Sequence, residues 1–156
     1  MNELSTYILL GSTLLVFLIF LSWTDIKSFR LPNTLTLPLI ILGVFQAYLL
    51  PSEITASIIG AVIGYLVFVV IEIAYKKFRK IDGLGRGDAK LLAAGGAWCG
   101  WMGVPYIVLI GSGLGIILAL LPKYRSLGRI PFGPCLALGI FMVWTAGAFV
   151  KLQVDM

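Results

Sequence analysis

Six long apolar stretches, separated by short polar linkers, dominate this sequence and restrict it to a membrane environment. The chain is 60% hydrophobic, and its mean hydropathy is +1.02. A helix needs about 20 apolar residues to span the hydrocarbon core of a bilayer. We therefore expect an all-α polytopic membrane protein, a bundle of about six transmembrane helices that forms one domain over residues 1–156. The stretches cover roughly residues 5–24, 33–50, 54–75, 88–102, 104–121 and 133–150.

The basic residues are distributed unevenly among the linkers. Linkers rich in Lys and Arg stay in the cytosol, and here such linkers follow the odd-numbered stretches. Both termini are therefore predicted to lie outside the cytosol. The first stretch has no basic residue before it and no small-residue cleavage site after it, so we expect a retained helix and not a signal peptide. The net charge of +5 then reflects topology, and we expect contacts with membrane lipids and none with nucleic acid. Eleven of the 12 basic residues follow the odd-numbered stretches or begin the fourth: Lys27, Arg30, Lys76, Lys77, Arg79, Lys80, Arg86, Lys90, Lys123, Arg125 and Arg129.

Two aspartates stand at the ends of apolar stretches in a chain with only 7 acidic residues. Asp25 closes the first stretch, and Asp88 opens the fourth. The predicted topology brings both to the cytosolic face. An ionisable group near hydrocarbon is costly, and two carboxylates at one depth point to a shared task such as activating water. Two simpler interpretations remain: Asp88 as a helix N-cap with Asp25 solvated at a helix end, or a transporter or assembly scaffold that handles protons or ions.

The composition excludes several other kinds of site. The chain has no histidine and only two cysteines, Cys99 and Cys135, which fall at different levels of the bundle and are not expected to form a disulfide. We therefore predict no metal and no cofactor. Ser112 lacks a histidine base and lies in the middle of a stretch, so we expect it to serve packing.

Some local patterns have structural explanations. Asp82 lies near Lys80 and Arg86, which indicates a surface position. Glu72 precedes Lys76 by four residues, a spacing that favours an ion pair along a helix. The turn before the second stretch predicts an N-cap at Asn33 or Thr34.

Three sequence blocks lie at the predicted linkers. The first covers residues 25–38, the second runs from 85 to 98 and begins with Gly85-Arg86-Gly87-Asp88, and the third covers 130–139. Together they resemble the peptidase domain of the type IV prepilin peptidases, the GxGD class of membrane aspartyl proteases. GxGD by itself is a weak signal, but the three blocks appear in order, each at a predicted cytosolic linker, and together with the regions between them they cover most of the chain.

The resemblance implies a function and a set of site residues. The family's two catalytic aspartates fall on Asp25 and Asp88. The family cleaves the basic leader of prepilins at the cytosolic membrane face, so the implied partner is a prepilin-like protein. We expect Gly85, Gly87 and Lys90 to contact this substrate. Many bacterial members also carry a region with paired CxxC motifs that is linked to N-methylation. Nothing in this sequence matches that region, so the resemblance extends to cleavage alone.

Overall fold

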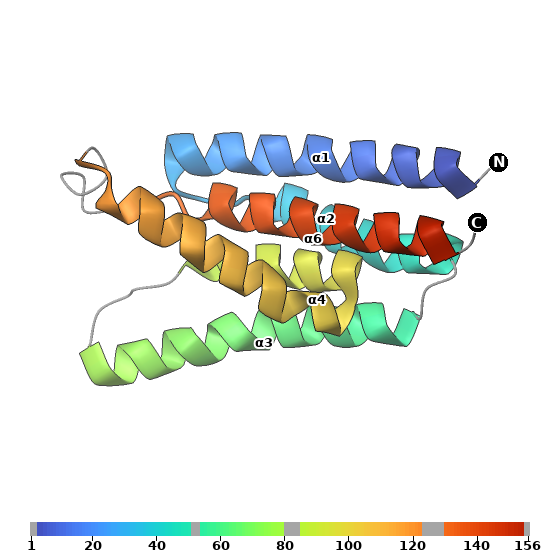
Figure 1. Ribbon diagram of the computed structural model, residues 1–156. Helices are drawn as coiled ribbons and strands as arrows, with labels where there is room; N and C mark the ends of the chain where they lie inside the picture. Colours follow the sequence, from blue (N-terminus) through green and yellow to red (C-terminus); the bar gives the residue numbers. More distant parts are fainter. Residues whose placement is uncertain (1–2, 51–53, 80–84, 123–129, 155–156) are drawn as a thin grey trace.

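The computed structural model describes residues 3–50, 54–79, 85–122 and 130–154, and all regular structure in these ranges is α-helical. The predicted all-α class is therefore confirmed for the described residues (Figure 1). The helices are α1 (Glu3–Ser28), α2 (Asn33–Leu49), α3 (Ile54–Arg79), α4 (Arg86–Leu120) and α6 (Gly133–Val154).

The predicted count of about six helices is slightly off: the described residues form five elements, and the fourth and fifth apolar stretches together make up α4, which a kink at Gly100 divides into two helical arms. Within α4, Gly100 leaves helical geometry with φ 71° and ψ 174°, a conformation that glycine adopts readily. Figure 1 shows the two arms of α4 folding back on each other at this point. A methyl group on Gly95 would lie 3.1 Å from Ile107 Cδ1, whereas residues 12 positions apart in a straight helix are separated by about 18 Å. The described residues thus form five helices, one of them a hairpin.

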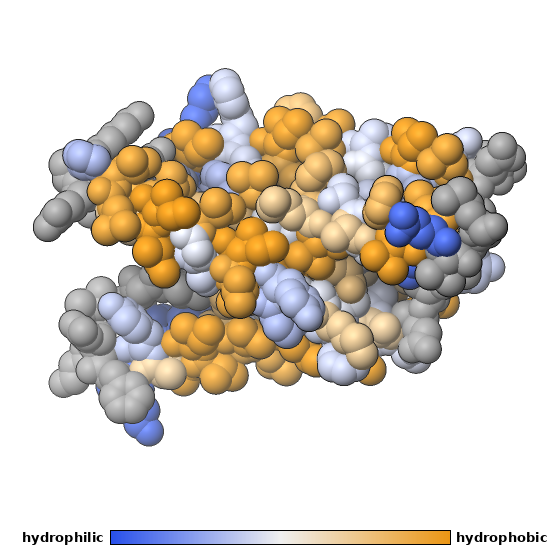
Figure 2. All heavy atoms as spheres, viewed as in Figure 1, coloured by the Kyte–Doolittle hydropathy of each residue, from blue (hydrophilic) through white to orange (hydrophobic). Residues whose placement is uncertain are grey.

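The outer surface of the bundle is apolar, as a membrane protein requires. Four helices, α1, α3, α4 and α6, are long and apolar enough to cross a bilayer, whereas α2 has only 17 residues. Large apolar side chains such as Phe20, Ile41 and Leu109 are exposed on the outside. Hydrophobic residues cover much of the visible length of the bundle (Figure 2). A water-soluble monomer rarely exposes so continuous an apolar surface, and we conclude that this is a multi-pass membrane protein.

The centre of the bundle is built around α4, which packs against α2, α3 and α6, while α1 packs on α6. Glycines permit the closest of these approaches. A Cβ atom on Gly60 of α3 would collide with the carbonyl oxygen of Gly96 of α4, and the reverse substitution would collide in the same way. Small residues are the usual means of bringing membrane helices together. The fully buried large apolar side chains are Leu14, Leu21, Leu39, Leu91, Leu92, Ile107, Leu136 and Ile140.

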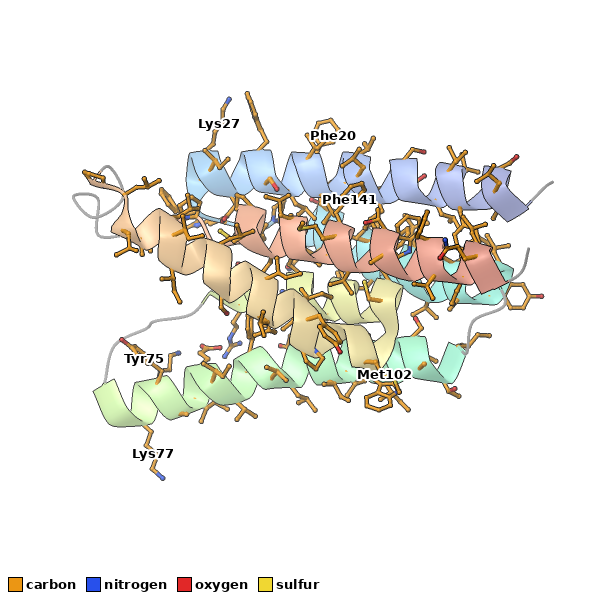
Figure 3. All side chains as sticks on the ribbon, in the orientation of Figure 1. Phe20, Lys27, Tyr75, Lys77, Met102 and Phe141 are labelled. Carbon is orange, nitrogen blue, oxygen red and sulfur yellow. The ribbon has the colours of Figure 1, made fainter. Side chains whose placement is uncertain are left out.

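The two ends of the bundle differ in what they carry. Both chain termini lie at one end (Figure 1). The end of α1 and the starts of α2, α4 and α6 meet at the other, where Lys27 and Lys77 project away from the bundle (Figure 3). This arrangement agrees with the expected clustering of basic linkers, although the orientation across the membrane stays a prediction. Four of the basic residues used for that prediction lie outside the described residues: Lys80, Lys123, Arg125 and Arg129.

Candidate active site

Asp25 is buried in the last turn of α1, with only 6% of its surface exposed. The helix ends three residues later, at Ser28, and Phe29 then adopts a positive φ of 52°. The Phe29 N–H donates to the Asp25 carbonyl oxygen at 2.8 Å. The Asp25 carboxylate points toward α6, and its Oδ2 accepts a hydrogen bond from the Gly133 backbone N–H at 2.9 Å. The solvated position considered for Asp25 is therefore wrong.

Asp88 lies in the first turn of α4, at the third helical residue. Gly85 occupies the N-cap position, and the Asp88 N–H donates to its carbonyl oxygen at 3.0 Å. The interpretation of Asp88 as the N-cap is therefore also wrong. Its side chain is partly buried, and a carboxylate in the first turn is favoured by the helix dipole. Within the described residues, no hydrogen bond reaches this carboxylate.

The fold brings Asp25 and Asp88 to one place, although 63 positions separate them in the sequence. Their carboxylates are close enough for their charges to interact. The thiol of Cys135, a buried residue near the start of α6, lies within electrostatic range of both. Three helices, α1, α4 and α6, therefore each contribute a polar group to the same end of the bundle. Two neighbouring carboxylates of this kind can divide acid and base roles between them.

The three residues expected to contact substrate lie around Asp88, but in different surroundings. Gly85 is exposed, and a methyl group on it would lie 3.7 Å from Asp88 Oδ2. A methyl group on Gly87 would lie 3.0 Å from Leu31 Cβ, so that glycine serves close packing against the α1–α2 turn. Lys90 Nζ donates to Asn33 Oδ1 at 2.7 Å and links α4 to α2. Of the three, Gly85 has the most open approach to Asp88.

The local predictions have mixed outcomes. The Glu72–Lys76 pair is confirmed, with a distance of 3.1 Å between Glu72 Oε1 and Lys76 Nζ. Cys99 and Cys135 are both free, as expected. The N-cap prediction for α2 is wrong: Pro32 occupies that position, which leaves the Asn33 side chain available to Lys90. Asp82 lies outside the described residues.

Sequence reasoning missed the contribution of α6. Neither the Gly133 N–H nor the nearness of Cys135 follows from a local pattern, since 108 residues separate Asp25 from Gly133. The Pro131-Phe132-Gly133-Pro134 stretch inside the third block was the available signal. It showed that this segment resembles the family, but it could not show which atom points toward Asp25.

The chain matches the model of the type IV leader peptidase family over residues 12–120. It belongs to this family. The matched range contains both aspartates of the site, and it ends before the segment that supplies Gly133. No solved structure matches the chain.

Several curated relatives of this leader peptidase family carry the name prepilin leader peptidase/N-methyltransferase. The protein from Escherichia coli (strain K12) is 44% identical over 127 residues, which cover 79% of this chain and 56% of the relative. The one from Burkholderia pseudomallei (strain K96243) is 40% identical over 127 residues, covering 78% and 41%. The one from Neisseria gonorrhoeae is 33% identical over 154 residues, covering 96% and 53%. The chain thus spans about half the length of the curated relatives it matches.

Proposed function

We propose that this protein is a membrane aspartyl endopeptidase that cleaves the leader peptide of type IV prepilin-like proteins. The observation that carries the proposal is the pair formed by Asp25 and Asp88. Two interacting carboxylates lie at one end of a membrane bundle in a chain of the leader peptidase family. One ionised and one protonated carboxyl group together supply a base for water and an acid for the scissile carbonyl. This chemistry needs neither a metal nor a cofactor, so a chelator should leave cleavage intact.

The position of the pair favours a peptidase over a transporter. Carriers usually place ionisable groups near the bilayer midplane. Asp25 lies within the last turn of α1 and Asp88 within the first turn of α4, where the backbone of a prepilin entering from the surface has a short path to both. Gly85, exposed beside Asp88, offers the substrate backbone a close approach, with Gly87 and Lys90 as further proposed contacts.

The proposed location is the plasma (inner) membrane, with both termini outside the cytosol and the aspartates at the cytosolic face. In this orientation anionic head groups attract the basic leader and hold it near the site. Reporter fusions test the orientation. Fusions at Lys77 and Arg125 should report the cytosol, and a fusion at Ser52 should report the outside. A periplasmic signal at Lys77 would reverse the arrangement.

The peptidase activity is tested by co-expressing the protein with a prepilin and measuring the size of the prepilin. Asp25→Asn and Asp88→Asn should each leave the leader attached, while both variants still insert into the membrane. Asp82→Asn is the matched control, because Asp82 is expected to lie on the surface, and this variant should still cleave. Full cleavage by either of the first two variants would exclude the proposed pair.

A further inference from the structure

The two carboxylates of the site differ in the hydrogen bonds that they accept. Asp25 Oδ2 accepts the Gly133 N–H at 2.9 Å and is buried, whereas no hydrogen bond from the described residues reaches the carboxylate of Asp88. A hydrogen bond from an N–H group stabilises a carboxylate in its charged form. The difference in bonding therefore gives the two aspartates different preferred states.

The backbone N–H of Gly133 can bond to Asp25 because Gly133 begins α6. It is the first residue of the helix, and the N–H groups of a first turn have no partner within their own helix. Phe132 precedes it, and its carbonyl oxygen accepts from the Leu136 N–H at 3.1 Å, so Phe132 occupies the N-cap position. A phenyl side chain has no oxygen to cap the helix. The free N–H and the positive end of the helix dipole are therefore both available to Asp25.

The absence of a side chain at Gly133 is also required. A methyl group there would lie 2.7 Å from Asp25 Oδ2, 3.0 Å from Cγ and 3.1 Å from Cβ. The carboxylate is part of the buried end of α1 and has little room to retreat. Glycine is thus the residue that lets the start of α6 reach Asp25.

We propose that Gly133 is a positioning residue whose backbone N–H keeps Asp25 as the ionised member of the pair and leaves Asp88 as the protonated member. This inference rests on the proposed peptidase function. Asp25 then removes a proton from water while the water oxygen bonds to the scissile carbonyl carbon, and Asp88 gives its proton to the carbonyl oxygen. The neutral tetrahedral diol collapses as its C–N bond breaks. Asp25 passes its proton to the leaving nitrogen, and Asp88 recovers a proton from a hydroxyl group of the diol.

The sharpest test replaces the backbone N–H of residue 133 by an ester oxygen, using glycolic acid at that position in the otherwise complete protein. This change removes the donor and adds no atom that collides with Asp25. We expect kcat for a purified prepilin to fall about 10- to 100-fold, the effect of losing one hydrogen bond to a charged group, with KM unchanged. The acid limb of the pH–kcat profile should move to higher pH, because Asp25 then holds its proton more readily. Among the described residues, the titratable groups on neighbouring helices that feel the charge of Asp25 are Asp88 and Cys135.

Two alanine variants on α6 complete the test. Gly133→Ala should lose at least as much kcat as the ester, because it adds the steric conflict. Gly147→Ala is the control, since a methyl group on Gly147 meets nothing within 4 Å, and it should keep the kcat and pH profile of the wild type. An ester variant with wild-type kcat and an unmoved acid limb would overturn the role of Gly133, even if Asp25→Asn and Asp88→Asn are inactive. Activity in those two variants would instead overturn the proposed peptidase.

Discussion

The two ends of this bundle differ in how completely their buried polar side chains are hydrogen-bonded. At the end near the termini, Gln46 donates to the Trp98 carbonyl oxygen at 2.8 Å and accepts from Trp144 Nε1 at 3.0 Å. Trp98 Nε1 donates to the Leu39 carbonyl oxygen at 2.8 Å, and Ser57 Oγ donates to that of Ala97 at 2.6 Å. At the other end, Asp25 has one hydrogen bond from the described residues and Asp88 has none.

This contrast distinguishes polar groups whose hydrogen bonds are made within the fold from carboxylates whose oxygens can still accept hydrogen bonds. A buried polar network whose members are satisfied rigidifies the helices that it joins. A carboxylate with unused acceptor oxygens costs stability, and that cost is typical of a reactive site. A cavity of about 320 Å³ lies at the end with the satisfied network and is lined by Gln46, Ser57 and Trp144. The unequal hydrogen bonding, and not the size of this cavity, distinguishes the carboxylate end.

Removal of the carboxylates, singly and together, should have the strongest effect on activity. Asp25→Asn and Asp88→Asn should each lower kcat by about 10²- to 10⁴-fold, the usual contribution of general acid–base groups. The double variant should lose little more than either single one, because the two act as a unit. Thermal unfolding in detergent should show no loss of stability in these variants. Additive losses of activity would mean that the carboxylates act independently.

A smaller effect, confined to stability, is expected where the glycines of α3 and α4 touch. Gly96→Ala places a methyl group against the carbonyl oxygen of Gly60. Overpacking of this kind costs about 1–3 kcal/mol, so the unfolding midpoint should fall. Gly113→Ala is the matched control on the same helix, since a methyl group there meets nothing within 4 Å, and it should leave the midpoint unchanged.

Disruption of the satisfied network should cost stability and spare the chemistry. Gln46→Leu keeps the side-chain volume similar but leaves the Trp144 N–H and the Trp98 carbonyl oxygen without Gln46 as a partner. We expect a loss of about 1–2 kcal/mol, near the lower part of the range for unsatisfied buried groups. The folded fraction should keep the wild-type kcat. A large fall in kcat at full stability would show that the two ends are coupled.

The smallest effect is expected at Glu72, a buried carboxylate with nearby cations. Lys76 Nζ lies 3.1 Å from Glu72 Oε1, and Arg86 Nε lies 3.9 Å from the same oxygen. Both cations are substantially exposed, and ion pairs of this kind contribute about 0–1 kcal/mol. Lys76→Gln should therefore lower the free energy of unfolding by less than about 1 kcal/mol. Lys77→Gln serves as the control, because Lys77 projects away from the bundle (Figure 3).

Features that depend on composition and on short spacing could be predicted from the amino-acid sequence. The apolar runs predicted the helices and the membrane environment, because burying a backbone in lipid requires internal hydrogen bonds. The four-residue spacing of Glu72 and Lys76 predicted their ion pair. The alternation of apolar runs and basic linkers brought Asp25 and Asp88 to the same end, since each crossing of the bundle reverses the chain direction.

Contacts between atoms far apart in the chain could be recognised only in the folded molecule. The reversal at Gly100 divides α4 into two arms that fold back on each other, and the sequence around this glycine does not indicate its φ angle. Asn33 bonds to Lys90 and does not cap α2, because the packing of α4 beside α2 supplies a charged partner. The Gly133 N–H reaches Asp25 across 108 residues. Such contacts are set by the relative placement of whole helices, which local periodicity does not encode.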